Sequence, residues 1–290
     1  MILITGSTGQ LGKATIELLL KKIPANRIAA LARDESKTAD LKQHGIEVRV
    51  GNYHDRASLA AAFKGIDKLL FISGNDVARR QQQHVTVVEA AKEAGVKHII
   101  YTSFARKNET ETNPLGIVAT SHIETDKLVK ASGIPYTIMQ NGLYADVLPM
   151  FFGEKVLDTG IYLPSGNGKA AYIKREDIAK AAVAILTSEG HEGKEYKIVN
   201  TKNYSLQDAA GILSELSGKP VSYINPTTEE YKASLTQANV PADAVGFLAS
   251  FSEAIKQGEF ESSDSDIETT LGITPASLKD FFKEAGFSKN

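Results

Sequence analysis

The chain of 290 residues is long enough to bury a substantial core, in one large domain or in a large and a small one. Hydrophobic residues make up 42% and charged residues 23% of the sequence, as in an ordinary globular protein, so disorder is not expected. The net charge of -2 without long runs of either sign speaks against binding to nucleic acid, and the absence of cysteine excludes disulfides and thiolate chemistry.

Targeting and metal-binding signals are also missing from the sequence. No stretch of about 18 apolar residues occurs, and the chain enters its first strand without a basic leader. We therefore expect a cytoplasmic protein with no membrane segment. The six histidines show no pair at metal-ligand spacing, so no metal site is predicted.

The first twelve residues form the most informative motif. An apolar run over Met1–Ile4 is followed by Gly6, Gly9 and Gly12 at three-residue spacing. Apolar positions at helical spacing come next, at Leu11, Ala14, Thr15, Leu18 and Leu19. Such a strand, glycine turn and helix N-terminus can cradle the diphosphate of a dinucleotide, because the glycines permit close backbone approach and the helix N-terminus favours an anion. The structural alternative is a plain strand-turn-helix corner.

Regular alternation of strands and helices continues after this motif. We expect strands at 1–4, 27–33, 46–50, 68–73, 98–103 and 136–139, and helices at 36–43, up to 63, at 77–94 and at 123–131. A polar loop is expected at 104–120, which contains Pro114 and Gly116. This order predicts a parallel sheet covered by helices on both faces, with its ligand at the carboxyl ends of the strands.

The pattern changes beyond residue 145. Residues 158–169 are rich in turns, 177–186 read as a helix, 194–199 as a further strand, and a helix capped by Ser205 is followed by shorter helical pieces. We therefore predict a Rossmann-type doubly wound α/β fold with a smaller C-terminal α/β substrate lobe. The nucleotide-binding domain spans 1–145 with a return near 176–201, and the substrate lobe spans 146–175 and 202–290.

The end of the second predicted strand bears on the choice of cofactor. An acidic residue there holds the ribose hydroxyls of NAD, whereas an arginine accommodates the 2′-phosphate of NADP. Here Arg33 ends the strand and Asp34 and Glu35 follow it, which favours NADPH over NADH. Asn52 and Tyr53, after the third strand, either flank the adenine or form a simple turn.

Several motifs together resemble the NmrA-like atypical short-chain dehydrogenases and, among these, the bacterial NADPH-dependent type 2 quinone oxidoreductases. They are Ile4-Thr-Gly-Ser-Thr-Gly-Gln-Leu-Gly12, Arg33, Thr102-Ser103, His122-Ile-Glu-Thr-Asp-Lys127 and Asn141-Gly-Leu-Tyr144. By resemblance the NADPH site comprises Gly6, Ser7, Thr8, Gly9, Gln10, Leu11, Arg33, Ser73, Gly74, Asn75, Gln140, Asn141, Gly142, Leu143, Tyr144 and Ala145. Relatives often carry arginine in place of Gln140 and an acidic residue in place of Asn52, so polar contacts to the cofactor differ here.

The catalytic tyrosine of ketone-reducing short-chain dehydrogenases is absent. That tyrosine stands four residues before a lysine, and here Ile123 precedes Lys127 at this spacing. An aliphatic side chain cannot donate a proton. Lys127 either holds the ribose or nicotinamide end or is an ordinary surface lysine, and Ser103 either positions a carboxamide or substrate oxygen or ends its strand. His122 is expected to be a packing or surface histidine.

Two functions are compatible with this pattern. The first is a reductase that transfers hydride from NADPH to a quinone or similar electron-poor acceptor, which needs no strong proton donor. Tyr144 and Tyr172 are its predicted pocket walls, while Phe151 and Phe152 are expected in the core. The second is a redox sensor that binds NADPH and acts through a protein partner. A homodimer is compatible with either function.

Overall fold

A seven-stranded parallel sheet forms the centre of the computed structural model, which describes residues 1–288. The strand order is β3-β2-β1-β4-β5-β6-β9, and every neighbouring pair is parallel. Its strands are β1 Ile2–Ile4, β2 Ile28–Ala32, β3 Glu47–Val50, β4 Lys68–Phe71, β5 His98–Phe104, β6 Tyr136–Asn141 and β9 Lys194–Ile198. The order reverses between β1 and β4, which is the switch point where such sheets bind ligands.

Helices cover both faces of the sheet because consecutive strand residues point to opposite sides. Ile4 and Leu70 face one hydrophobic cluster with α1 and α8, whereas Leu3 and Leu69 face a second cluster with α3 and α4. The covering helices are α1 Gln10–Leu20, α2 Ala39–Gln43, α3 Arg56–Phe63, α4 Arg80–Glu93, α5 Ile117–Ala131 and α8 Arg175–Thr187. Short 3-10 turns lie at Ala25–Arg27, Glu35–Lys37 and Ala145–Val147.

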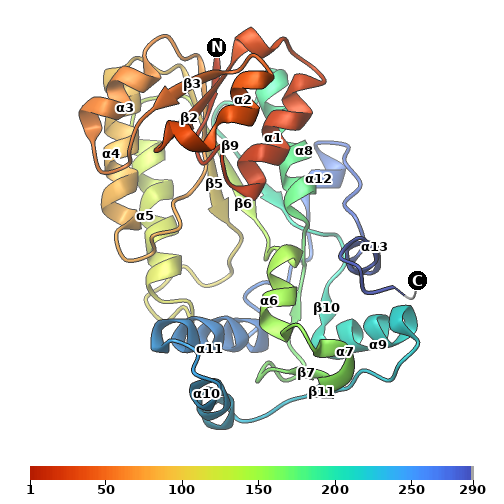
Figure 1. Ribbon diagram of the computed structural model, residues 1–290. Coiled ribbons are helices and arrows are strands. Elements are labelled where there is room, and N and C mark those ends of the chain that lie inside the picture. The colour runs from red at the N-terminus through yellow and green to blue at the C-terminus, as the bar shows by residue number, and fades with distance from the viewer. Residues whose placement is uncertain (289–290) are drawn as a thin grey trace.

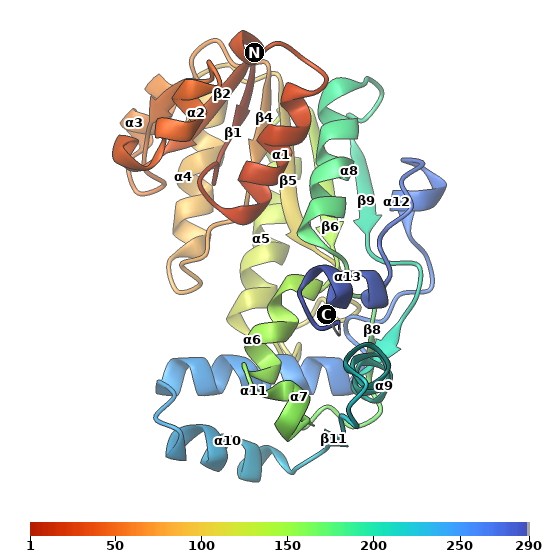
Figure 2. The same ribbon diagram turned by 45° about the vertical axis from the view of Figure 1, so that its right-hand side comes forward.

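A third hydrophobic cluster belongs to the elements beyond the carboxyl ends of the strands (Figure 1 and Figure 2). Its helices and strands are α6 Leu148–Phe152, α7 Val156–Thr159, β7 Ile161–Tyr162, β8 Lys169–Ala170, β10 Tyr204–Ser205, α9 Leu206–Ser217, β11 Tyr223–Ile224, α10 Thr228–Gln237, α11 Ala242–Lys256 and α13 Leu278–Glu284. The short helix α12 Asp266–Thr269 packs beside β9 instead, and its Ile267 joins the cluster of α1 and α8. β8 pairs with β10 and β7 with β11. These elements form a roof over the ligand edge of the sheet.

The predicted fold class is confirmed, with differences at element ends. α5 starts at Ile117, well before the predicted residue 123, because Gly116 takes a φ of +51° and turns the chain directly into the helix. β9 pairs with β6 as the last strand of the sheet. The division into two lobes at the predicted boundaries stays a prediction. No described helix combines the length and apolar character needed to cross a bilayer.

Candidate nucleotide and acceptor site

The glycine turn between β1 and α1 closes on itself. Gly6 has a φ of +58°, and its carbonyl accepts a hydrogen bond of 3.0 Å from the Gly9 amide. A Cβ on Gly12 would lie 2.3 Å from that same carbonyl oxygen, so the turn and the helix are packed against each other without room for a side chain. The turn therefore holds the first residues of α1 in a fixed position.

The N-terminus of α1 suits an anion. Its N-cap, Gly9, makes no side-chain hydrogen bond, and the first turn carries no acidic residue. A Cβ on Gly9 would meet only the Gly6 carbonyl oxygen, at 3.3 Å, and Gly9 lines a cavity. The helix dipole and the amides of the first turn favour negative charge at this point. The residues present thus fit the diphosphate of a dinucleotide.

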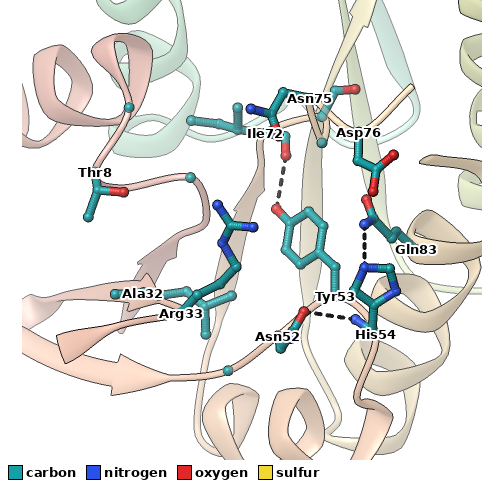
Figure 3. Close-up of a pocket in the computed structure, with 16 residues that line it drawn as sticks. Thr8, Ala32, Arg33, Asn52, Tyr53, His54, Ile72, Asn75, Asp76 and Gln83 are labelled. Atoms are coloured by element: carbon teal, nitrogen blue, oxygen red, sulfur yellow. Dashed lines mark hydrogen bonds between the residues drawn. The ribbon is translucent and has the colours of Figure 1, made fainter. Parts of the chain in front are cut away.

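The cavity in front of this turn has a volume of about 300 Å³ and runs along the ends of β1, β2, β3 and β4. Figure 3 shows its wall, with Tyr53 standing upright and Arg33 between Tyr53 and Thr8. The Tyr53 hydroxyl donates to the Ile72 carbonyl oxygen at 2.9 Å, which fixes the ring in this wall. Asn52 is exposed, and its side-chain oxygen accepts from the His54 amide at 3.1 Å. Both predicted adenine neighbours line the cavity.

Arg33 is the cation at the end of β2. Its side chain is exposed, makes no ion pair within residues 1–288, and points into the cavity (Figure 3). The two acids that follow it face other partners. Asp34 accepts from the Ser36 amide at 2.9 Å, a contact that lowers its pKa, and Glu35 pairs with Lys42 at 2.5 Å. The guanidinium of Arg33 is thus available for an external anion.

The loop after β4, residues 73–75, lies between this cavity and a second one and lines both. The Ser73 amide donates to the Thr102 hydroxyl at 2.9 Å, and the Gly74 amide donates to Nε2 of His84 at 3.0 Å. Nδ1 of His84 therefore carries the proton and donates to the Thr125 hydroxyl at 2.8 Å. His84 thus ties this loop to α5.

His84 makes the loop sensitive to acid. Burial, with the nearby Arg80 charge, lowers the pKa of His84 to about 3. A folded pKa below the unfolded value near 6.5 means that the neutral ring stabilises the fold above pH 6.5 and that this contribution is lost as the pH falls towards 3. We expect the free energy of unfolding in urea to fall below pH 6.5, and to fall less steeply in His84→Gln. Equal slopes in both proteins would contradict this assignment.

The second cavity has a volume of about 360 Å³ and lies between the sheet edge and the roof. Its polar lining comprises Ser73, Asn75, Arg80, Thr102, Ser103, His122, Asn141, Tyr144 and Arg175. Its apolar lining comprises Val77, Phe104, Val118, Leu143, Val147, Phe151, Phe247, Phe251 and Phe260. Phe251 stacks on Phe260 with ring centres 5.8 Å apart, and Phe247 lies 4.5 Å from Phe251. Such walls suit a flat aromatic molecule.

Ser103 lines this second cavity at the end of β5. Its hydroxyl donates to Asp126 at 3.0 Å, and the same carboxylate oxygen pairs with Arg106 at 2.8 Å. Burial raises the pKa of Asp126, and the Arg106 guanidinium opposes that shift. Since its proton is engaged by Asp126, Ser103 can serve a ligand chiefly as a hydrogen-bond acceptor.

The remaining predicted site residues are distributed over the same edge. Asn141, Gly142, Leu143 and Tyr144 line the second cavity. Ser7 is buried and donates to the Leu31 carbonyl oxygen at 2.8 Å. Gln10 and Leu11 form the first turn of α1, and Ala145 is buried next to the cavity residue Tyr144. Ser7, Gln10, Leu11 and Ala145 line neither cavity, so their predicted contacts with the cofactor stay a prediction.

Lys127, Tyr172 and Gln140 also line neither cavity. The side chain of Lys127 is 69% exposed, pairs with Glu124 and lines neither cavity, so its position does not support a role in catalysis or cofactor binding. Tyr172 is 1% exposed and belongs to the roof core instead of the pocket wall. The side chain of Gln140 lies against the neighbouring strand β9 and donates to Glu195 at 3.2 Å.

Other residues of the second cavity were missed at the sequence level. Phe247, Phe251 and Phe260 come from α11 and the turn after it, more than a hundred residues beyond the glycine turn. Arg175 lies 4.7 Å above the Tyr144 ring and pairs with Asp146. His122, expected in packing or at the surface, is buried, lines the cavity and contacts the Tyr101 hydroxyl through Nδ1 at 2.8 Å.

The fold, the glycine turn and Arg33 define a Rossmann-type nucleotide-binding protein. Its first cavity adjoins a second one that is lined by aromatic side chains. Residues 1–287 match the NmrA-like family model, and the chain belongs to this family. It is 40% identical to quinone oxidoreductase 2 of Escherichia coli, with 96% of each chain covered, and 32% identical to the NAD(P)H azoreductase of Xenophilus azovorans, with 86% of each covered. The Citrobacter triphenylmethane reductase in complex with NADP(H) superimposes with a TM-score of 0.91 at 38% identity, over 98% of this chain and 100% of that one.

Proposed function

We propose that this protein is an NADPH-dependent reductase that transfers hydride to a quinone or a similar electron-poor acceptor. The observation that carries this proposal is the meeting of two cavities at the loop 73–75. The first contains the glycine turn and Arg33, which fit the diphosphate and the 2′-phosphate. The second is lined by aromatic rings at the place where the far end of a dinucleotide would arrive. Similarity to an NADPH-dependent quinone oxidoreductase and to an NAD(P)H azoreductase supports the same function.

Bound NADPH supplies the hydride, and the residues of this chain position the acceptor. The aromatic side chains of α6 and α11 exclude water and hold a flat ring against the sheet edge. Ile123, at the sequence position of the missing proton donor, lines neither cavity. Tyr144 lines the second cavity, but burial raises the pKa of its hydroxyl and makes it a weaker acid. Orientation therefore provides most of the acceleration.

The proposal predicts a clear substrate preference. A ketone becomes an alkoxide that needs a proton from a placed acid, a contribution of about 10²–10⁴ in rate, whereas a quinone becomes a stabilised hydroquinone anion. We expect NADPH oxidation with small quinones and negligible turnover of simple ketones, measured by loss of NADPH absorbance. Rapid ketone reduction would contradict the mechanism, and no oxidation with any quinone would remove the proposed activity.

Two variants on α5 serve as controls for this assay. Ile123→Ala and Lys127→Ala should leave the quinone rate within about twofold of wild type, since neither side chain reaches a cavity and surface changes cost little. A loss of more than tenfold in Lys127→Ala would restore a functional role to that lysine.

The exposed apolar side chains favour a small-molecule pocket over a sensor surface. Large exposed apolar residues of the described chain are Val50, Ile117, Met150, Ile224 and Phe247. Phe247 lines the second cavity, and Ile117 and Met150 directly precede the lining residues Val118 and Phe151. A sensor that acts through a protein partner, and a homodimer, both stay predictions from the sequence.

A further inference from the structure

Arg80 is a buried cation in the wall of the second cavity. It is the first residue of α4, and only 7% of its surface is exposed. Its Nε donates to the Gly74 carbonyl oxygen at 2.7 Å, and Nη1 donates to the Ser121 hydroxyl at 3.3 Å. Both acceptors are neutral, and Nη2 has no acceptor among residues 1–288. The guanidinium therefore bridges the loop after β4 and α5, and its Nη2 can donate to a ligand.

No carboxylate of residues 1–288 contacts this guanidinium. Within the described chain Arg80 forms no ion pair, and Asp76, the acid one turn earlier, lies 3.9 Å from Arg79. The other buried arginine of this region, Arg106, has Asp126 as a partner at 2.8 Å. A buried guanidinium stays charged, and burial of a charge without a counterion is costly. Such a charge in the wall of a ligand cavity suits an anionic group of the ligand.

Asp76 acts on Arg80 through its charge but forms no ion pair with it. The other titratable groups around Arg80 are neutral. His84 faces it from the same helix, His122 from α5, Tyr101 from β5 and Tyr144 from the segment after β6. Burial lowers the pKa of both histidines far below neutrality and raises the pKa of both tyrosines, so all four are neutral at pH 7. The lining residues of this cavity include two arginines and no carboxylate.

We propose that Arg80 is a catalytic residue that stabilises the oxygen anion formed on the acceptor, and that the pocket selects neutral acceptors whose reduced form is an oxyanion. This inference rests on the proposed function. In the reaction the C–H bond of the dihydronicotinamide breaks, and its hydrogen and both electrons pass to the quinone. The products are NADP⁺ and the hydroquinone monoanion, which takes one proton from water to complete the hydroquinone.

His122 complements Arg80 at the same cavity. The Tyr101 hydroxyl stays protonated and contacts Nδ1 of His122 at 2.8 Å. When that hydroxyl donates, the imidazole carries its own proton on Nε2 and offers a neutral N–H to a ligand. A charged guanidinium and a neutral N–H together take the place of the missing tyrosine as stabilisers of developing negative charge.

The test uses 4-nitrophenol, a planar ring that binds either as a phenol or as a coloured phenolate. Its affinity is measured against pH by absorbance, with and without NADP⁺. We expect the wild type to bind the phenolate about 10-fold or more tightly than the phenol, the lower bound for a nearby opposite charge. The preference should be lost in Arg80→Gln and largely kept in Arg80→Lys. Arg79→Gln is the matched control, because its side chain is 71% exposed on the neighbouring position, and it should behave as wild type.

Equal phenolate preference in wild type and Arg80→Gln would overturn the inference. If Arg80→Gln does not fold, the wild type and Arg80→Lys decide, since the absence of a phenolate preference in the wild type refutes it as well. NADPH affinity, measured by fluorescence, distinguishes a role in the pocket from a purely structural role. A structural role predicts that Arg80→Gln also changes the affinity for NADPH, whereas a role toward the acceptor leaves that affinity unchanged. The binding test needs no turnover. A phenolate preference without quinone reduction would therefore leave the anion site standing and refute only the proposed activity.

Discussion

Gly9→Val should abolish NADPH binding while leaving a cooperatively folded protein. Gly9 has φ -85° and ψ 168°, a conformation that valine adopts readily, and a Cβ there would meet only one atom within 4 Å. That atom is the Gly6 carbonyl oxygen at 3.3 Å, which needs to shift by only a few tenths of an ångström, whereas the side chain occupies the space in front of the first turn of α1. Loss of two hydrogen bonds to a charged group, at about 1.5–3 kcal/mol each, corresponds to an affinity decrease of about 100-fold or more.

Gly12→Ala is the contrasting variant. A Cβ at this position would lie 2.3 Å from the Gly6 carbonyl oxygen and 2.8 Å from the Ser7 Cα, so backbone must move. We expect this protein to melt at a lower temperature than wild type, whereas Gly9→Val melts near it. Calorimetry and NADPH titration by fluorescence separate the two effects. Wild-type affinity in Gly9→Val would show that the diphosphate site lies elsewhere.

Local sequence patterns predicted the nucleotide half of the molecule well. The strands around the glycine turn are short, apolar runs between clear turn residues, and the structure places them as the buried centre of the sheet. Glycine spacing and Arg33 at a strand end depend on residues close in sequence, so their geometry follows from a single strand-turn-helix unit. Gly9, Arg33 and Tyr53 follow β1, β2 and β3, and they line the same cavity because these parallel strands end at one edge of the sheet.

The acceptor pocket was harder to predict because it is assembled by tertiary contacts. Phe247 and Phe251 reach it from α11, and no local pattern relates that helix to the sheet edge. Arg80 stands in a polar run, Arg79-Arg80-Gln81-Gln82-Gln83, that reads as a solvated helix end. Its burial arises only when α5 packs beside α4. For Lys127 the local pattern was present but the tertiary placement was not. This lysine matches the spacing of the catalytic lysine of short-chain dehydrogenases, yet it lies on the exposed side of its helix.

Arg33→Ala should lower the affinity for NADPH by about 1.5–3 kcal/mol, or roughly 10- to 100-fold, and leave the affinity for NADH nearly unchanged. The guanidinium can meet the 2′-phosphate with two parallel hydrogen bonds, and NADH offers it no such group. The structure strengthens this expectation, because Arg33 has no carboxylate partner within residues 1–288 and the acids beside it engage Ser36 and Lys42. Arg33→Lys should retain the charge but lose the paired geometry, and so fall between the two.

The measurement is titration of both nucleotides into wild type, Arg33→Ala and Arg33→Lys. Raising the salt concentration should weaken NADPH binding by the wild type more than by Arg33→Ala, since the guanidinium is exposed and its interaction is screened. Arg27→Ala, an exposed arginine at the opposite end of β2, is the matched control and should alter neither affinity. An equal loss for both nucleotides in Arg33→Ala would assign the arginine to general binding, and the 2′-phosphate would then need another partner.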